Sequence, residues 1–275
     1  MATIPIPNSV IDQPTSVLLP AFSLWWREMV RFYRQRSRVV GVILSPLVFW
    51  ILLGAGFGRS LRTGDNGASQ NYLEYFFPGA LVMIVLFTSI FTMMSVIEDR
   101  KEGFLLSVMV APIHRSAVVL GKVLGGTSLA TIQGLIFLIL APVIGIHFSG
   151  AQFAMVVLLV FLMAFALTAL GFCVAWVLDS AQAFHAIINL FLIPLWMLSG
   201  ALFPVSGASG WLRAVMQANP LTYGVEGLRA TLFPALIAPR SLSVATSAEV
   251  LAGFSAVVFI AAYVVANRRS TKPAA

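Results

Sequence analysis

Residues 95–126, SVIEDRKEGFLLSVMVAPIHRSAVVLGKVLGG, form a charged and glycine-broken stretch within an otherwise apolar chain. Hydrophobic stretches flank it on both sides, and each is long enough to cross a lipid bilayer, which takes about 20 mostly apolar residues. The pattern therefore predicts a loop at the membrane surface, between two spans, that transmits a signal to a soluble partner.

The composition is that of an integral membrane protein. Of the 275 residues, 59% are hydrophobic and 10% are charged, and the mean hydropathy is +0.95. Soluble domains carry about 25% charged residues, so this chain could not cover a globular surface with polar groups. The net charge of +7 is more typical of membrane orientation than of nucleic-acid binding, because the chain lacks the interleaved aromatic and basic residues of an RNA-binding face.

The hydrophobic pattern predicts an all-α polytopic fold with six transmembrane helices. The six apolar stretches are residues 41–58, 76–97, 117–146, 151–178, 183–203 and 247–267. Two prolines, Pro142 and Pro194, are expected to kink their helices or to break them near the membrane surface. No separate soluble domain is indicated, so residues 1–275 form a single membrane domain.

The basic residues indicate the orientation, because cytoplasmic segments of membrane proteins carry an excess of Lys and Arg. With the N-terminus in the cytoplasm, the inner segments hold Arg27, Arg31, Arg34, Arg36, Arg38, Arg100, Lys101, Arg115, Lys122, Arg268, Arg269 and Lys272. The outer segments hold only Arg59, Arg62, Arg213, Arg229 and Arg240. This asymmetry predicts that both termini are cytoplasmic.

Residues 18–38, ahead of the first predicted span, have the pattern of an amphipathic helix. At 100° per residue, one side gathers Phe22, Trp25, Trp26, Met29 and Tyr33. The opposite side gathers Arg27, Arg31, Arg34 and Arg38. We expect a helix in the membrane interface, with its aromatic side chains in the acyl boundary and its arginines toward anionic lipid headgroups. An ordinary basic flank that happens to be helical is the alternative.

Residues 204–240, between the fifth and sixth predicted spans, are too broken to cross the membrane and too apolar for a free loop. Short helices that dip into the outer leaflet fit this composition. Irregular backbone persists at that depth only where protein or a water-filled cavity shelters it. We therefore expect an outer re-entrant helical segment.

The surface loop, residues 98–115, has its own helical pattern. Glu98 and Glu102 are four residues apart, which places both carboxylates on one face of a helix, and Gly103 then weakens it. An apolar stripe of Phe104, Leu105, Val108 and Met109 follows and is stopped by Pro112. A short helix of this kind suits a groove on a partner protein. A solvated turn between two spans explains the charges equally well.

This loop resembles that of the ABC-2 type transport permeases, which are the membrane subunits of ATP-driven exporters. The resemblance is carried by the acidic run from Glu98 to Gly103, by Ala111-Pro112 and by Leu120-Gly121-Lys122. Phe104 stands where many members have Thr, so a conventional helix cap is not expected there. The resemblance implies that the loop and the amphipathic helix contact an ATPase subunit. The implied coupling residues are Arg27, Arg31, Arg34, Glu98, Asp99, Arg100, Glu102, Gly103, Phe104 and Met109.

A second resemblance lies between the fifth and sixth predicted spans. Residues 199–204 and 219–229 are similar to the late outer region of the branch that exports drugs, lipids or polysaccharides. The residues implied at the outer gate are Phe203, Pro204, Asn219, Pro220, Tyr223, Glu226 and Arg229. Glu226 and Arg229 can pair at i, i+3 on a helix, although a surface ion pair of little energetic consequence is the plainer interpretation.

No catalytic or metal-binding pattern emerges from the sequence. His114, His147 and His185 are far apart, and the residues around Gly121-Lys122 do not make a phosphate-binding loop, because Ser116 stands where a glycine is needed. Asp179 is expected to cap the fifth predicted span. Gln133 and Asn189 are the main polar candidates for burial within the spans. We therefore expect no catalytic role and no cofactor in this chain, with ATP and Mg²⁺ handled by a partner.

The resemblance implies a permease subunit of an ABC exporter in a bacterial-type cytoplasmic (inner) membrane. Two permease subunits, simplest as a homodimer, would form the path for the cargo and would join two ATPase subunits, whose closure would push on residues 98–109 and 18–38. An ATP-independent secondary carrier or channel is the alternative, but its usual mid-membrane ionisable pair is absent from the predicted spans. A membrane-embedded enzyme acting on lipids would need an acid, base or metal constellation.

Overall fold

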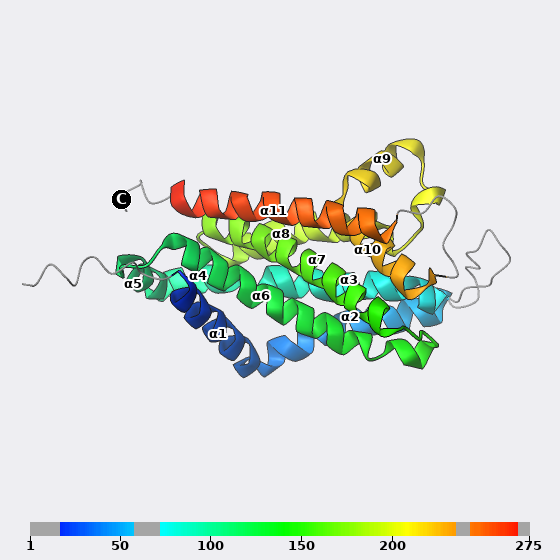
Figure 1. The fold of residues 1–275 in the computed structure, drawn as a ribbon, viewed down its shortest axis with the longest axis horizontal. Helices are drawn as coiled ribbons and strands as arrows, with labels where there is room; N and C mark the ends of the chain where they lie inside the picture. Colours follow the sequence, from blue (N-terminus) through cyan, green and yellow to red (C-terminus); the bar gives the residue numbers. More distant parts are fainter. Residues whose placement is uncertain (1–16, 58–71, 235–242, 269–275) are drawn as a thin grey trace, which may run out of the picture.

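The computed structural model describes residues 17–57, 72–234 and 243–268. These residues fold as an elongated bundle of helices, without strands (Figure 1). In chain order, its α-helices are α1 (Leu18–Arg34), α2 (Arg36–Phe57), α3 (Tyr72–Thr92), α4 (Met94–Lys101), α5 (Phe104–Val110), α6 (Arg115–Leu138), α7 (Gly150–Val177), α8 (Ala181–Trp196), α9 (Gly210–Ala218), α10 (Pro220–Leu232) and α11 (Val244–Arg268).

Five helical segments are long and apolar enough to cross a membrane. They are Tyr72–Lys101, Arg115–Ile144, Gly150–Val177, Ala181–Ala201 and Val244–Arg268, which correspond to the last five of the six predicted spans. The first predicted span, residues 41–58, falls on α2, whose apolar stretch is limited to Pro46–Gly56. The all-helical prediction is thus confirmed, and five of the described helices meet the length and apolarity that a crossing requires.

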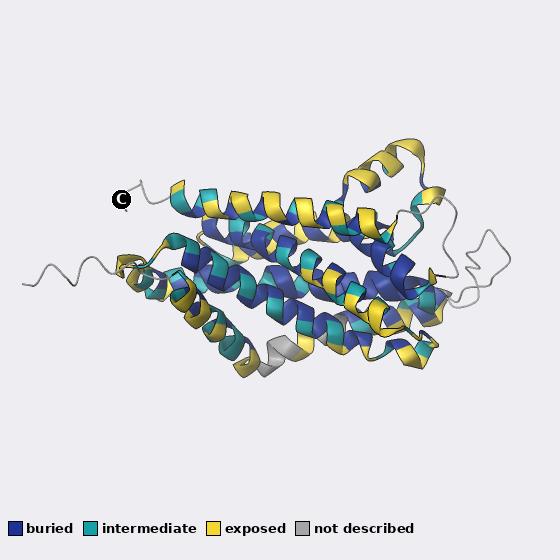
Figure 2. Ribbon diagram, viewed as in Figure 1, coloured by how far each residue is buried: buried dark blue, intermediate teal, exposed yellow. Residues whose placement is uncertain are grey.

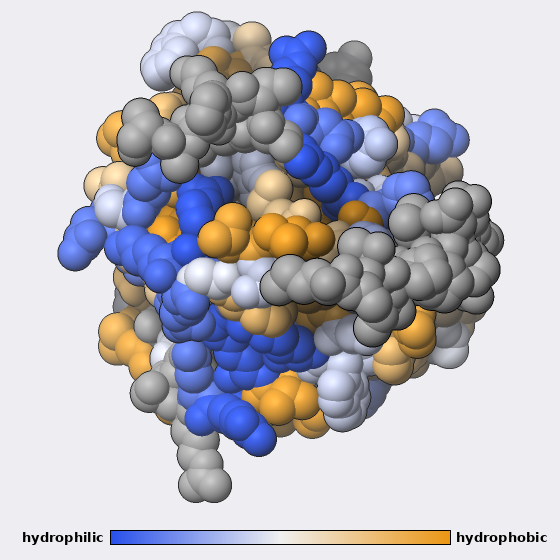
Figure 3. All heavy atoms as spheres, turned by 90° about the vertical axis from the view of Figure 1, so that its left-hand side faces the viewer, coloured by the Kyte–Doolittle hydropathy of each residue, from blue (hydrophilic) through white to orange (hydrophobic). Residues whose placement is uncertain are grey.

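The segments predicted to be cytoplasmic lie together at one end of the bundle (Figure 1). We call this the inner end; it carries α1, α4, α5, the start of α6 and the end of α11. Viewed from this end, hydrophilic and hydrophobic side chains share the surface (Figure 3). The side chains of Arg36 and Arg38, and residues 59, 62, 240, 269 and 272 altogether, lie outside the described part of the chain.

Helix α3 forms the centre of the bundle, and the burial map shows it enclosed by its neighbours (Figure 2). Aromatic rings tie it to α2 and α6. Phe77 of α3 stacks on Phe137 of α6 with ring centroids 4.9 Å apart, and Trp50 of α2 lies edge-on to both rings. Aromatic pairs contribute about 0.5–1.5 kcal/mol each beyond their buried area, so this cluster fixes α2 against the core.

The two prolines that were expected to kink or break their helices lie near helix ends, but only Pro142 follows directly on one. Helix α6 ends at Leu138, shortly before Pro142. Pro194 lies in the last turn of α8, and the chain then widens into a π-helical turn at Met197–Ala201, where Gly200 has a φ of +80°. Only glycine adopts that left-handed backbone without strain, so Gly200 is the residue at which the helix breaks.

The predicted outer segment, residues 204–240, folds up to residue 234 as a short turn followed by α9 and α10. Helix α9 projects from the bundle and is largely exposed, whereas α10 is buried against α7 and α11 (Figures 1 and 2). Residues 235–240 lie outside the described residues. How deeply this segment enters the membrane stays a prediction.

Candidate functional site

Helix α1 lies along the inner half of α6, and two glycines of α6 make this close approach possible. A side chain at Gly121 would lie 2.6 Å from the carbonyl oxygen of Ala21, and one at Gly125 would lie 2.8 Å from the Cβ of Glu28. The spacing of the two glycines places both on the α1-facing side of α6, as in small-residue helix contacts within membranes. The backbones can therefore approach closely enough for charged side chains to meet between them.

Asp99, in α4, is the acceptor at which the arginines of α1 converge. Its carboxylate is fully buried and accepts two hydrogen bonds from Arg27, at 2.8 and 2.7 Å, and one from Arg31, at 2.6 Å. Arg31 also donates to Glu98 at 2.7 Å. The hydrogen bond to Asp99 raises the pKa of Arg27, while partial burial opposes that shift. Arg27 is therefore a permanent cation at this site.

Lys122, in α6, completes the arrangement from the opposite side. Only 1% of its surface is exposed, and its Nζ donates to Glu28 Oε1 at 2.5 Å, to Ser95 Oγ at 3.2 Å and to Asp99 Oδ2. Glu28, on α1, is buried as well. Three cations and three anions thus meet between α1, α4 and α6, and we call this set the inner charge cluster: Arg27, Glu28, Arg31, Glu98, Asp99 and Lys122.

The inner charge cluster can be buried because its positive and negative charges balance. Taking an ion out of water costs several kcal/mol, and that cost is offset only when opposite charges and hydrogen bonds surround it. Removing one partner from a buried pair leaves an uncompensated charge and costs about 3–5 kcal/mol. The inner charge cluster should therefore hold its three helices in one arrangement.

The arginines of α1 do not lie as predicted. Arg27 and Arg31 were expected to face lipid headgroups, but they bind the carboxylates of α4, because these carboxylates lie within reach when α1 packs on α6. Arg34 is exposed. Of the predicted aromatic side, Phe22, Trp26 and Tyr33 are exposed, whereas Trp25 donates to Ser128 of α6 at 3.0 Å.

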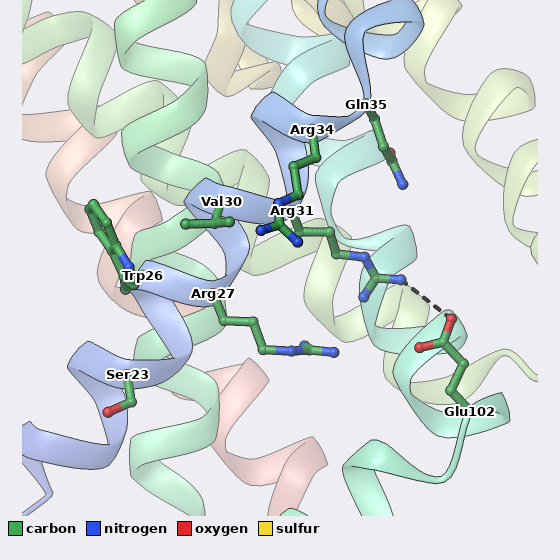
Figure 4. Close-up of a pocket in the computed structure, with 8 residues that line it drawn as sticks. All are labelled: Ser23, Trp26, Arg27, Val30, Arg31, Arg34, Gln35 and Glu102. Atoms are coloured by element: carbon green, nitrogen blue, oxygen red, sulfur yellow. Dashed lines mark ion pairs between the residues drawn. The ribbon is translucent and has the colours of Figure 1, made fainter.

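A groove of about 540 Å³ opens between α1 and the end of α4 (Figure 4). Arg27 and Arg31 extend from α1 toward α4 along this groove, and Arg31 lies 3.8 Å from the largely exposed Glu102. The groove is lined by Ser23, Trp26, Arg27, Val30, Arg31, Arg34, Gln35 and Glu102.

Arg100 has different partners from the other predicted coupling residues. Its guanidinium donates to the carbonyls of Trp176 and Leu178, at 2.8 and 3.1 Å, and to Asp179 at 3.0 Å. It thus satisfies carbonyls at the C-terminal end of α7, where a cation is favoured. The expectation that Asp179 caps the following helix is wrong, because the hydroxyl of Ser180 accepts from the backbone N–H of Ala183 instead.

The predicted loop helix is α5, which stands apart at the inner end (Figure 1). Gly103 precedes it with a φ of +76°, and no side chain caps its start. Phe104 turns back to the charge cluster, where the guanidinium of Arg27 lies 3.6 Å from its ring centroid. Leu105 is buried, while an apolar face formed by Leu106, Met109 and Val110 is exposed.

The predicted outer-gate residues lie at the opposite end, in and beside α10. Asn219 caps α10 by accepting from Leu221 at 3.0 Å, and it also donates to Leu195 of α8 at 2.6 Å. Pro220 is the first residue of α10, and Tyr223 donates to the carbonyl of Gln217. Phe203 and Pro204, which precede this region, are half-buried.

Glu226 and Arg229 form the expected i, i+3 ion pair at 3.0 Å. The pair is more buried than a surface pair, since Arg229 is 17% exposed. Arg229 also donates to the carbonyl of Gly200 at 3.1 Å and lies 4.2 Å above the ring of Tyr75. We call Tyr75, Gly200, Glu226 and Arg229 the outer arginine cluster; it holds the broken end of α8 against α3 and α10.

Four residues of these two clusters were not predicted as site residues: Glu28, Lys122, Tyr75 and Gly200. Glu28 was detectable as an acid within a basic helix, and Lys122 as a charge inside the predicted span 117–146. Tyr75 gave no signal in the sequence. Among the described residues, no group of His, Cys, Asp and Glu is placed to hold a metal ion.

Residues 21–233 match the family described as ABC-2 type transporter. A protein named as a transport permease, ycf38, from Cyanophora paradoxa is 29% identical over 210 residues, which cover 76% of this chain and 72% of the relative. The daunorubicin resistance ABC transporter permease protein DrrB1 of Streptomyces coeruleorubidus is 23% identical over 215 residues, covering 74% and 71% of the two chains.

A third relative is a doxorubicin resistance ABC transporter permease protein, DrrC, of Mycobacterium tuberculosis. It is 22% identical over 213 residues, which cover 74% of this chain and 73% of the relative. The region that matches the family contains the inner charge cluster, α5 and the outer arginine cluster.

Proposed function

This chain belongs to the ABC-2 type transporter family, and from that membership we propose how its helices serve an exporter. The protein is an integral membrane protein and the permease subunit of an ABC transporter. It is not itself an enzyme and carries no cofactor, and it works with an ABC ATPase subunit, which is a separate chain.

In the proposed assembly, two copies of this chain join two ATPase subunits in a cytoplasmic (inner) membrane. Both termini lie in the cytoplasm, and α2 provides a sixth crossing, so that one membrane domain spans residues 1–275. Support comes from the excess of basic residues in the segments gathered at the inner end (Figure 1). The outer segment 204–240 enters the membrane from the other side, where α10 is sheltered by α7 and α11.

The proposed contact with the ATPase is formed by α5 and the adjoining groove. Leu106, Met109 and Val110 present an apolar face outside the predicted spans, and such faces mark sites of protein association. The groove supplies the exposed charges of Arg34 and Glu102 beside it.

The observation that carries this proposal is the inner charge cluster directly behind α5. Phe104, the first residue of α5, lies against Arg27, and Arg27 is bound to Asp99. A displacement of α5 is therefore resisted by α1, α4 and α6 together, because none of them can move alone without separating buried charges. The ATPase would then move these helices as one body and open or close the path.

The proposed cargo is an amphiphilic molecule of the kind that drug-, lipid- or polysaccharide-exporting permeases carry. Two of the relatives are named for resistance to daunorubicin and doxorubicin, which favours drug-like compounds within this range.

The test replaces the exposed apolar pair of α5 by Leu106→Asp with Val110→Asp and measures how much ATPase subunit copurifies. Interface residues of this kind contribute about 1–2 kcal/mol each, so the loss of both should weaken ATPase binding about thirtyfold to a thousandfold. The matched control is Trp211→Asp with Val215→Asp, an exposed apolar pair of the same spacing on α9 at the other end. Equal ATPase recovery with both pairs would contradict the proposed contact.

A further inference from the structure

Another cavity, of about 370 Å³, opens at the end of the bundle opposite to α5 (Figure 1). Three parts of the chain meet there: the first turn of α3, the connection between α6 and α7, and the end of α10. We call it the outer cavity, and its size lies in the range of small-molecule sites. It is lined by Glu74, Ile144, Gly145, Ile146, His147, Leu232, Phe233 and Pro234.

Glu74 is the acidic residue of the outer cavity, and it differs from the other enclosed acids of the protein. It is half-buried and forms no hydrogen bond or ion pair with any residue that the structure describes. The other described carboxylates that are buried or half-buried all bind a lysine or an arginine; they are Glu28, Glu98, Asp99 and Glu226. Glu74 therefore lacks the opposite charge that each of these acids has.

The end of α10 adds to the negative potential of the outer cavity. Helix α10 ends at Leu232, and the last carbonyls of a helix carry a partial negative charge that favours a cation. Leu232 and Phe233 line the cavity at this helix end. Pro234, which follows, has no N–H group and so provides no backbone donor for an anion. A carboxylate and a helix C-terminus thus face the same space.

The remaining lining residues favour an organic cation over a metal ion. Calcium takes about six to eight oxygen ligands, whereas the outer cavity offers one carboxylate. No group of three or more His, Cys, Asp or Glu residues in the described chain is placed to hold a metal. Ile144, Ile146 and Leu232 are apolar, and Phe233 is aromatic, a residue type that attracts organic cations.

We propose that the outer cavity binds an organic cation, whose charge is neutralised by Glu74 and whose hydrocarbon part is covered by the apolar lining. A half-buried carboxylate is unfavourable without an opposite charge, and the cation supplies that charge. This inference rests on the proposed export of amphiphilic molecules. It narrows the cargo to positively charged amphiphiles, which are held at the outer end before they are released.

The test uses two probes of the same shape and opposite charge, tetraphenylphosphonium and tetraphenylborate. Equilibrium dialysis measures the binding of each probe to the permease copurified with its ATPase subunit in a non-ionic detergent. We expect saturable binding of tetraphenylphosphonium and none of tetraphenylborate. Glu74→Gln keeps the shape of the side chain but removes its charge, so it should weaken binding of the cation about tenfold.

The matched control is Glu249→Gln. Glu249 lies near the start of α11, is exposed, binds no cation among the described residues and does not line the outer cavity. This variant should bind tetraphenylphosphonium as the unaltered protein does. A second variant, Phe233→Leu, keeps an apolar residue and removes the ring, so binding should weaken about threefold. Equal binding by Glu74→Gln and the unaltered protein, or equal losses in Glu74→Gln and Glu249→Gln, would overturn the inference.

A lipid headgroup can also carry an organic cation, so the source of the cation is tested by competition. Dialysis is repeated in nanodiscs of phosphatidylglycerol alone and of phosphatidylglycerol with phosphatidylethanolamine, whose headgroup is an ammonium. We expect the same affinity for tetraphenylphosphonium in both. Displacement by phosphatidylethanolamine would assign the outer cavity to a lipid headgroup and would overturn its assignment to cargo.

Export from liposomes separates this inference from the proposed function. With the ATPase subunit and ATP present, export of tetraphenylphosphonium should fall about tenfold in Glu74→Gln and stay unchanged in Glu249→Gln. If the unaltered protein exports uncharged amphiphiles but neither binds nor exports tetraphenylphosphonium, the cation site is wrong while the exporter stands. If binding depends on Glu74 but no amphiphile is exported, the cation site stands and the proposed cargo is wrong.

Discussion

The two ends of the molecule hold their helices by different means. The inner charge cluster joins six charged side chains from α1, α4 and α6, and three of them are almost completely buried. The outer arginine cluster has a single ion pair within α10, and its cation also binds a backbone carbonyl and an aromatic ring. Loss of one charged side chain should therefore destabilise the helix packing at the inner end, whereas the outer arginine cluster would keep some of its contacts.

This difference indicates which parts of the chain can move. At the outer end, the helix is already interrupted at Gly200. Arg229 stabilises this interruption by a hydrogen bond to the carbonyl of Gly200, and such a bond can be replaced by another when the helix moves. The inner end also has a left-handed glycine, Gly103 between α4 and α5, but there α1, α4 and α6 are joined to one another by buried and balanced charges. We therefore expect the inner end to move as a unit and the outer end to bend, which is what an exporter driven from the inner side requires.

The largest effect is expected from Lys122→Met. It leaves the carboxylates of Glu28 and Asp99 buried without their shared cation, so the free energy of unfolding should fall by about 3–5 kcal/mol. Thermal unfolding of the purified protein in detergent measures the change. Adding Glu28→Gln removes one anion and restores the balance, so the double variant should regain most of the loss. If the double variant were less stable than Lys122→Met, the claim that balanced charges stabilise the inner charge cluster would be contradicted.

A smaller effect is expected when α1 is pushed away from α6. Gly121→Ala places a methyl group 2.6 Å from a backbone oxygen of α1, so one helix must shift, at a cost of about 1–3 kcal/mol. Protease cleavage within α1 should become faster, because the helix is held less tightly. The control is Gly253→Ala on α11, where a side chain meets no atom within 4 Å. Equal cleavage rates in both variants would show that α1 does not depend on this approach.

At the outer end, Arg229→Lys is expected to cost only about 1 kcal/mol. Lysine keeps the charge for Glu226 but loses the planar group that reaches Gly200 and covers Tyr75. The melting temperature should fall slightly, and export should change more than stability. Arg213→Lys, at an exposed arginine of α9 that also binds carbonyls, serves as the control. If Arg229→Lys lowered the free energy of unfolding as much as Lys122→Met does, the two ends would not differ in the way described.

The smallest effect on stability is expected from Arg34→Ala. Arg34 lines the groove, is exposed and is paired with no carboxylate among the described residues, so the free energy of unfolding should change by less than about 0.5 kcal/mol. If the groove contacts the ATPase, the same variant should reduce ATPase recovery. Unchanged recovery would exclude Arg34 from the contact and would leave α5 as the remaining candidate.

Sequence reasoning located five of the six predicted spans as long apolar helices, and it located the loop helix, because these depend on local patterns such as apolar runs and glycines. It also paired Glu226 with Arg229, since both lie on one helix. It misplaced Arg27 and Arg31, because their partners belong to a helix about 70 residues away, and periodicity does not tell which helices become neighbours.

Residues that act between helices were the hardest to predict. Lys122 was counted only among the inner basic residues and in the Leu120-Gly121-Lys122 motif, and the packing of α1 on Gly121 and Gly125 shows what neutralises it. Asn189 was predicted to be buried as a polar residue within an apolar span, yet the fold of one chain leaves it exposed, whereas Gln133 is buried. Both cases show that a polar residue in a span predicts a partner without saying which one.

The most direct test of the account measures export per ATP hydrolysed in liposomes that contain the permease and its ATPase subunit. The double variant Lys122→Met with Glu28→Gln should remain folded and bind the ATPase, because α5 is unchanged, while the ion pair that joins α1 to α6 is lost. We predict normal or faster ATP hydrolysis with export reduced at least about tenfold, a coupling loss of about 1.4 kcal/mol or more. Export per ATP equal to that of the unaltered protein would contradict the claim that the inner charge cluster transmits the movement.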